Sequence, residues 1–403
     1  MTESNKPYEG ALSDIRVIEM GQLLAGPFCG QLLGDFGAEV IKIEQPDRGD
    51  PMRDWGREKP QGQSLWWPVI ARNKKCITVN ARLEEGQAII KDLVARSDIL
   101  VENFRPGTLE KWNLSYEQLR EINPGLILVR VTGFGQTGPY SARAGYGAIG
   151  EAMGGMRYCV GSPDRPPSRL GISIGDTLAA SFACVGALSA LHHRSNTGEG
   201  QVVDSALYEA VLNVMESLIT EYDKTGFIRE RTGAILPNVA PSNVYPTKDT
   251  EHLIAANQDT VWSRLAQAMG RPELAEDERY ATHDARGRNQ AELDDLISEW
   301  TRGFTSAELE AIMNEHGIPN GPIYRAPEML EDAHFKAREA IVEVAHPVFG
   351  SLKMQNVMPK LSATPGKIKW VGPTHGEHTD EVLGGLLGYD SETMSQWREN
   401  GII

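Results

Sequence analysis

The chain has 403 residues, of which 55 are acidic and 40 are basic, so its formal charge at pH 7 is −15. Apolar residues make up 40% of it and charged residues 24%, which is ordinary globular usage and excludes a largely disordered chain. The length indicates about two or three domains. So acidic a chain is unsuited to general binding of nucleic acids or anionic membranes, and an anionic ligand would need a locally basic cleft.

The cysteines and the apolar stretches exclude further classes of protein. The four cysteines are widely scattered without a C-x-x-C pair, which argues against a disulfide framework or a structural zinc site. The amino terminus, 1–7, lacks the apolar region of a signal peptide. The most apolar stretch, 177–191, is shorter than the roughly 18 to 20 residues that a membrane span needs, so it predicts a buried helix. We expect a soluble cytoplasmic protein without a bound metal and with no nucleic-acid or membrane partner.

The first 135 residues alternate strands and helices. Short apolar runs are separated by stretches with apolar residues at helical spacing, a pattern typical of βαβ units that build a parallel sheet with helices on both faces. Ligands of such sheets bind beyond the carboxyl ends of the strands. The predicted strands are 16–20, 39–43, 75–79, 99–101 and 126–131, and the predicted helices are one that ends at 36 and those at 83–97 and 116–122.

The composition and the predicted secondary structure change in the rest of the chain. Residues 132–175 are rich in glycine and proline and predict loops. We predict a large α/β domain over 1–225, a smaller α+β domain over 226–328, and a linker and carboxyl-terminal segment over 329–403 that returns to the large domain. The elements predicted here are helices at 177–193 and 205–225, a strand at 252–256, helices at 261–269, 291–302 and 306–316, and a closing helix at 380–387.

Two kinds of glycine motif suggest competing functions. The segments 133–138 and 145–150 match G-x-G-x-x-G, but neither opens a helix in the way that a dinucleotide fingerprint requires, so a nicotinamide or flavin site is disfavoured. The segment 171–175 matches the nucleophile elbow G-x-S-x-G, with Ser173 as nucleophile and His375 or His378 as a late base. A serine hydrolase therefore stays open as an alternative.

The pair His375 and His378 has a second interpretation. The histidines could bind a metal, but no third ligand suggests itself. We favour a turn into the last helix, with Thr379 as its N-cap and acidic residues in the first turn.

Asp176 stands directly after Gly175, where the apolar helix is expected to begin. An N-cap is one interpretation. The other is a carboxylate nucleophile that the helix dipole helps to keep ionised, with the adjacent glycine leaving room for a substrate carbonyl. One residue can fill both roles.

Basic and polar residues follow several predicted strands. In an acidic protein, such groups at strand ends indicate a cleft for a polyphosphate, and Phe104 could stack on a nucleobase. The candidates are Asn73, Lys74, Lys75, Asn103, Arg105, Lys111 and Arg143.

These residues lie within blocks that resemble class III CoA-transferases, a family that includes formyl-CoA transferase, carnitine CoA-transferase and α-methylacyl-CoA racemase. The likeness covers nearly the whole chain, and the order and spacing of so many blocks make chance agreement very small. The blocks are L-A-G-P at 24–27, F-G-A-E-V-I-K-I-E at 36–44, N-K-K at 73–75, V-E-N-F-R-P-G at 101–107, G-F-G-Q-T-G-P at 133–139, G-D at 175–176, T-G-E-G-Q at 197–201 and G-E-H-T at 376–379.

The resemblance implies an α/β fold with a Rossmann-like parallel-sheet large domain and a smaller domain, in two chains interlocked as a homodimer. It implies an acyl-CoA donor and a carboxylic acid acceptor as substrates, with CoA as substrate and no permanently bound cofactor. The catalytic aspartate of the family falls on Asp176. The residues expected to contact CoA are Gln22, Leu24, Ala25, Gln45, Lys74, Lys75, Val79, Arg82, Asn103, Phe104, Arg105, Lys111, Arg143 and Tyr146.

Two departures from the family pattern bear on the substrate. Racemases of the family have a histidine where this chain has Tyr146, so racemisation, the second alternative, is disfavoured. Formyl-CoA transferase has a run of glycines that is missing between 238 and 257 here, which argues against oxalate and formyl-CoA. We expect small dicarboxylates such as succinate, because basic and polar loop residues could hold a second carboxylate.

Overall fold

The computed structural model describes residues 10–403, so the segment on which the signal-peptide prediction depends lies outside it. The chain divides into two compact units. Unit 1 comprises the chain as far as Met156 together with Leu170–Ile219 and Ala337–Ile403, and unit 2 comprises Arg157–Arg169 and Thr220–Lys336. Unit 2 therefore differs in its limits from the predicted small domain at 226–328.

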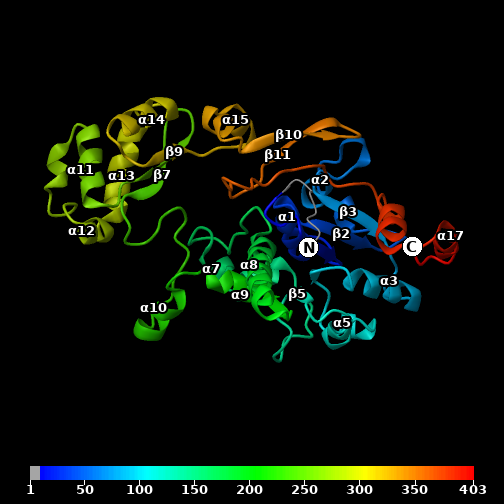
Figure 1. Ribbon diagram of the computed structural model, residues 1–403. Coiled ribbons are helices and arrows are strands. Elements are labelled where there is room, and N and C mark those ends of the chain that lie inside the picture. The colour runs from blue at the N-terminus through cyan, green and yellow to red at the C-terminus, as the bar shows by residue number, and fades with distance from the viewer. Residues whose placement is uncertain (1–9) are drawn as a thin grey trace. The chain divides into compact units, whose positions relative to one another are not determined.

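Unit 1 is built on a six-stranded sheet in which every neighbouring pair is parallel, as the sequence predicts (Figure 1). The strand order is β3-β2-β1-β4-β5-β6. A crevice is expected at the carboxyl ends of β1 and β4, because the strand order reverses between them. The strands are β1 (Arg16–Glu19), β2 (Glu39–Glu44), β3 (Lys74–Thr78), β4 (Ile99–Glu102), β5 (Ile127–Thr132) and β6 (Val202–Ala206).

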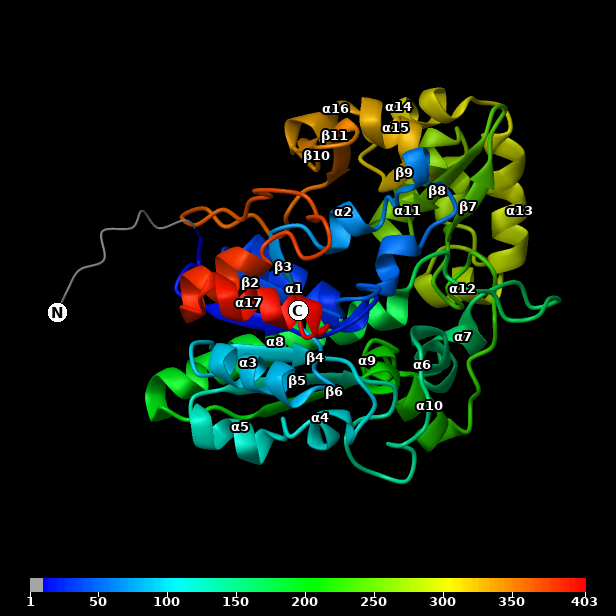
Figure 2. The ribbon, with the colours of Figure 1, turned by 90° about the vertical axis from the view of Figure 1, so that its right-hand side faces the viewer.

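The helices of unit 1 cover both faces of the sheet, and they can be followed in Figures 1 and 2. Alternate strand residues supply the two cores: Val17 packs with residues of α1 and α8 on one face, and Ile18 packs with residues of α3 and α5 on the other. The helices are α1 (Ala25–Asp35), α2 (Trp67–Ile70), α3 (Glu84–Val94), α4 (Thr108–Lys111), α5 (Tyr116–Ile122), α6 (Gly147–Met153), α8 (Ile174–Thr197), α9 (Leu207–Asn213) and α17 (Ser391–Glu399).

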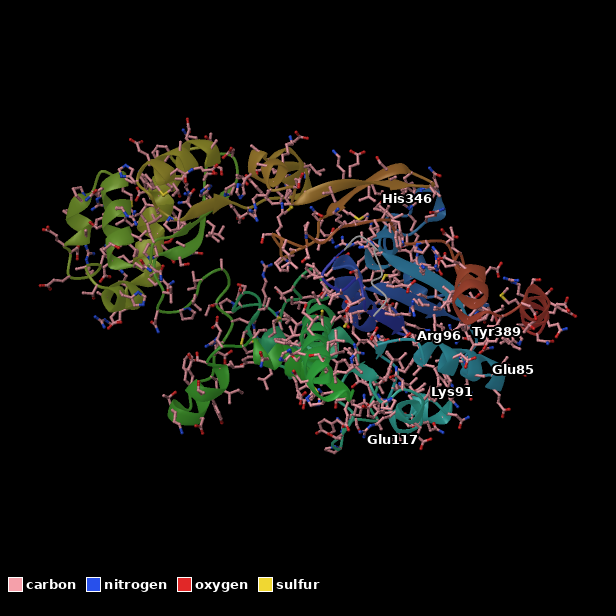
Figure 3. All side chains as sticks on the ribbon, viewed as in Figure 1. Glu85, Lys91, Arg96, Glu117, His346 and Tyr389 are labelled. Atoms are coloured by element: carbon pink, nitrogen blue, oxygen red, sulfur yellow. The ribbon has the colours of Figure 1, made fainter. Side chains whose placement is uncertain are left out.

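The carboxyl-terminal segment packs on the α3 side of unit 1. Arg96 donates to the carbonyl of Leu386 at 2.7 Å, and Tyr389 hydrogen-bonds to Asp92 on α3; Figure 3 labels Arg96 and Tyr389. A hairpin of β10 (Ile341–His346) and β11 (Gly350–Gln355) precedes this segment. The chain end itself, Ile402 and Ile403, is buried in the same core.

Unit 2 has a three-stranded sheet and its own apolar core around Trp262 and Leu265. The predicted strand and three helices are present here with shifts of one or two residues. The elements are β7 (Ser242–Pro246), β8 (Glu251–Ala255), β9 (Asn320–Pro322), α11 (Asp259–Ala268), α12 (His283–Arg288), α13 (Gln290–Thr301), α14 (Ser306–Glu315) and α15 (Ala326–Glu331); α7 (Met156–Cys159), α10 (Leu218–Thr225) and α16 (Ala333–Ala337) lie at the unit limits.

Three sequence predictions differ from the structure in unit 1 and at its limit with unit 2. The single helix expected at 205–225 is two helices, α9 and α10, and its first two residues belong to the strand β6, whose Val202 pairs with Leu128 of β5 and extends the sheet. The apolar helix α8 is longer than expected, at 24 residues, and only partly buried. Thr379 is not an N-cap: its hydroxyl accepts from the amide of Thr78 at 3.1 Å, and the closing π-helical segment η4 (Glu381–Leu387) has Asp380 at its cap position.

Candidate active site

A cavity of about 220 Å³ lies in unit 1, at the carboxyl ends of β4 and β5 and beside the segment that follows β1. This is the edge at which a parallel sheet binds its ligands. Nine of the predicted site residues line it. They are Gln22, Leu24, Ala25, Asn103, Phe104, Arg105, Arg143, Tyr146 and Asp176.

Asp176 lies in the first turn of α8 as its third residue, and Ser173 occupies the N-cap position. The N-cap interpretation of Asp176 is therefore wrong. The carboxylate lies directly on Gly147, because a methyl group at that glycine would come within 2.2 Å of Oδ2. A carboxylate in the first turn of a long helix is favoured in its ionised form by the helix dipole.

Two more glycine contacts shape the surroundings of Asp176. A methyl group at Gly175 would lie 2.7 Å from the carbonyl oxygen of Gly147, and one at Gly133 would lie 2.8 Å from the Cα of Gly145. The glycine-rich stretches that resembled dinucleotide fingerprints thus serve close packing of backbone against backbone beside the carboxylate.

The described residues that line the cavity include three charged side chains, Asp176, Arg105 and Arg143. Arg143 stacks its guanidinium on the ring of Tyr140, with 3.5 Å between Cζ and the ring centroid. Phe104 meets Trp112 edge to face at 5.0 Å between ring centroids, so its ring is fixed on the cavity wall. An acidic chain therefore has a locally basic cleft, as an anionic ligand requires.

Asn103 lines the cavity, but its carboxamide bonds to the protein. Its Oδ1 accepts from the amide of Gln22 at 2.8 Å, and its Nδ2 donates to the carbonyl of the same residue at 2.8 Å.

Lys74 corrects the sequence-based set of CoA contacts. Its side chain is completely buried, and its ammonium lies 2.7 Å from both Oε2 of Glu19 and the carbonyl oxygen of Pro27. Burial lowers the pKa of this lysine. It therefore holds the core together and has no surface with which to reach a ligand.

Five other predicted contacts lie outside the cavity lining. Lys75 is the second residue of β3, and its ammonium pairs with Glu39 and Glu381, both at 2.8 Å. It therefore lies away from the carboxyl ends of the strands, where ligands bind. Val79 is fully buried. Gln45, Arg82 and Lys111 follow β2, β3 and β4 along the chain and stay predictions for more distant parts of a long ligand.

Sequence reasoning missed Trp55, Thr132 and Leu207, which also line the cavity. Trp55 is 40% exposed and meets Trp66 edge to face. The signal that could have identified Trp55 is its closeness in the sequence to Trp66 and Trp67, because tryptophan is mostly buried in proteins and a group of three calls for an explanation.

Neither of the two histidines proposed as the base of a serine hydrolase lies near Ser173. Nδ1 of His378 accepts from the amide of Cys76 at 3.3 Å, and Nε2 of His375 lies 2.9 Å from the carbonyl oxygen of Gln45. Both histidines thus lie beside β2 and β3, at one edge of the sheet. Ser173 precedes α8, which contacts β5 and β6 at the opposite edge. The described residues hold no cluster of three or more potential metal-binding side chains.

Comparison with known proteins identifies the family to which the chain belongs. The chain belongs to CoA-transferase family III, whose family model matches residues 12–379, and it is a CoA-transferase of that class, as predicted. It is 60% identical over 393 residues to the succinyl-CoA–D-citramalate CoA-transferase of Chloroflexus aurantiacus, covering 97% of this chain and 98% of that protein.

Two further matches have lower sequence identity. The succinate–glutarate CoA-transferase of Agrobacterium fabrum is 36% identical, with 93% of this chain and 95% of that protein covered. A crystal structure of a CaiB/BaiF family protein from Brucella suis matches with a TM-score of 0.84 and 35% identity, covering 94% of this chain and 100% of that chain.

Proposed function

We propose that this enzyme moves CoA from succinyl-CoA to a short, substituted dicarboxylic acid of the citramalate type, through a covalent intermediate on Asp176. The names of the relatives support dicarboxylic substrates. The observation that carries the proposal is the carboxylate of Asp176, seated on Gly147 in a cavity whose other charged side chains are Arg105 and Arg143. A guanidinium is suited to hold the second carboxylate of such an acid or the phosphates of CoA.

The proposed reaction exchanges acyl groups at one carboxylate. Asp176 attacks the thioester carbonyl of the donor, which forms a mixed anhydride and releases CoA as thiolate. The thiolate attacks the aspartyl carbonyl, which forms an aspartyl-CoA thioester and releases the donor acid. The acceptor carboxylate then attacks this thioester, and the released thiolate attacks the acceptor carbonyl of the new anhydride, which forms acceptor-CoA and restores Asp176. Each step replaces one acyl bond by another of similar energy.

Backbone amides are the proposed donors to the oxyanion that forms at each step. The glycine-rich backbone around Gly133, Gly145 and Gly147 borders Asp176 or its cavity and carries no side chains that would hinder approach. A well-aimed amide contributes about 3 kcal/mol to such a transition state. Water has to be excluded, because it would hydrolyse the anhydride.

The nucleophile is tested by Asp176→Asn. This change keeps the shape of the side chain but removes the attacking carboxylate, so we expect CoA transfer to fall by about 10³-fold or more. Transfer is measured by mass spectrometry with a panel of acyl-CoA donors against free mono- and dicarboxylic acids. Trapping during turnover with hydroxylamine or borohydride should place an adduct on residue 176.

Ser173→Ala is the matched control, because Ser173 lies in the turn before Asp176 and only a serine hydrolase would need it. It should retain transfer. Activity in Asp176→Asn, or its loss in Ser173→Ala, contradicts the proposed chemistry. Racemisation of a 2-methylacyl-CoA would instead favour the racemase alternative, although Tyr146 occupies the place of its base.

We also propose a cytoplasmic homodimer of interlocked chains, without a nucleic-acid or membrane partner. The support is α8, whose outward side exposes Phe182, Val185 and Leu188. By length and composition this helix could also cross a membrane, a test that core helices of globular proteins pass as well. Its alanine side packs in the sheet core of unit 1, which favours a protein surface as the cover for the remaining side.

A further inference from the structure

One wall of the cavity is the segment Gln22, Leu23 and Leu24, which connects β1 to α1 without regular secondary structure. Leu23 has a φ of +63°, in the left-handed region that branched side chains rarely adopt. Such a conformation persists only where the surroundings hold it.

Buried charges hold one side of this segment. The amide of Leu23 donates to Oδ1 of Asp50 at 3.1 Å, and the carbonyl of Gly21 accepts from Nζ of Lys42 at 2.8 Å. Lys42 also lies 2.7 Å from Oδ2 of Asp50 and 2.9 Å from Oε1 of Glu19, so its three N–H groups are used. These three charged residues are fully buried, and moving any of them would leave an uncompensated charge.

Asn103 holds the other side. Its carboxamide pairs with both the amide and the carbonyl of Gln22, at 2.8 Å each, in the way that a neighbouring strand would. The close fit extends to Gly21 and Gly26, where an added methyl group would come within 3.1 and 3.3 Å of this carboxamide. One of the two N–H groups of this carboxamide and one lone pair of its oxygen are therefore used on the backbone of Gln22.

We propose that Asn103 is a positioning residue, which binds the amide and the carbonyl of Gln22 so that Gln22, Leu23 and Leu24 form the wall against which CoA rests. This role differs from the direct CoA contact that the sequence predicts for Asn103. It rests on the proposed function, since it takes CoA as the ligand of the cavity.

The test is Asn103→Asp, which keeps the shape but places a carboxylate oxygen against the carbonyl of Gln22. We expect the Kd for CoA, measured by calorimetry, to rise about tenfold at neutral pH. At lower pH the new carboxyl takes up a proton and can again donate to that carbonyl. The affinity should then return toward that of the wild-type enzyme. A simple loss of packing would show no such recovery.

Asn123→Asp is the matched control. Asn123 is also half-buried and donates through Nδ2 to two carbonyls, those of Val94 at 3.0 Å and Ser97 at 2.7 Å, but it is not part of the cavity lining. This variant should lower the Tm and leave the Kd for CoA unchanged. Asn103→Ser, which loses both bonds and gains no charge, should weaken CoA at every pH and replaces Asn103→Asp should that variant not fold.

The outcomes separate this inference from the proposed function. An Asn103→Asp enzyme that binds CoA as tightly as the wild type, or whose loss of affinity does not depend on pH, overturns the positioning role while CoA transfer stands. A wild-type enzyme that binds no CoA overturns the proposed function and this inference together.

Discussion

Gly147 shows how a missing side chain shapes this site. The carboxylate of Asp176 occupies the space that a methyl group on Gly147 would need, at 2.2 Å from Oδ2. The distance is far shorter than any real contact, so the two groups cannot coexist in this arrangement. Glycine at 147 is therefore a condition for the position of the carboxylate.

Gly147→Ala should displace Asp176 and lower CoA transfer by about 100-fold, because a shift of about 1 Å in a reacting group has an effect of that size. The Tm should change little, since Gly147 is the first residue of α6 and alanine is a good helix former. Gly385→Ala is the control: Gly385 also lies in a helical segment, η4, and a methyl group there meets nothing within 4 Å. Equal activity of the two variants would show that the carboxylate need not rest on residue 147.

At this scale the sequence predicts the kind of residue better than its environment. Asp176 and Arg105 were found from the elements that precede or follow them, and both line the cavity. Lys74 met the same criterion but is buried against Glu19. The difference depends on which long side chain finds a carboxylate in the core, and that partner is 55 residues away in the chain.

At the scale of elements, an ion network links β4, β5 and α4 beside the cavity. Glu102, the last residue of β4, accepts from Nε of Arg130 on β5 at 2.7 Å and from the amide of Phe104 at 2.6 Å. Arg130 also contacts Glu110 on α4 at 2.8 Å. Burial raises the pKa of Glu102 to about 7, against the effect of Arg130.

This shift predicts a pH dependence of stability. Between the ordinary value of 4.5 and about 7, the folded chain retains a proton on Glu102 that the unfolded chain has lost. The contribution of Glu102 to the free energy of unfolding is therefore complete below pH 4.5 and falls, by about 3 kcal/mol, as the pH rises to about 7.

Glu102→Gln removes this titration. The free energy of unfolding of the wild type, relative to that of Glu102→Gln, should therefore fall as the pH rises from 4.5 to about 7, as measured by urea denaturation. Glu117→Gln, at an exposed position on α5 that Figure 3 labels, is the control and should follow the wild type. A difference between wild type and Glu102→Gln that stays constant with pH would contradict the raised pKa.

Elements with a strong local pattern were predicted well, and those that depend on a partner were not. The buried strands β1 to β5 lie within a residue or two of their predicted limits, because each contains valine, isoleucine or leucine in a short apolar segment. β6 begins at the exposed Val202 and is specified by its pairing with β5, which no local periodicity contains.

At the scale of the whole molecule, the charge of −15 and the exposed apolar side of α8 point in different directions. A strongly acidic surface disfavours association of identical chains, whereas exposed apolar groups favour it. Phe182, Val185 and Leu188 are 38%, 59% and 42% exposed on a helix whose other side is in the core. Interlocked chains would cover this side, and so the proposed dimer accounts for its composition.

Val185→Asp tests that cover, because a charge placed in an apolar contact between chains loses hydration without gaining a partner. We expect light scattering to give the wild type twice the mass of one chain and Val185→Asp the mass of a single chain. Val348→Asp is the control, since Val348 is an exposed valine between β10 and β11, outside α8, and should leave the mass unchanged. A dimeric Val185→Asp would remove α8 from the contact. A wild-type chain that is monomeric and sediments with phosphatidylcholine vesicles would instead assign this side of the helix to lipid.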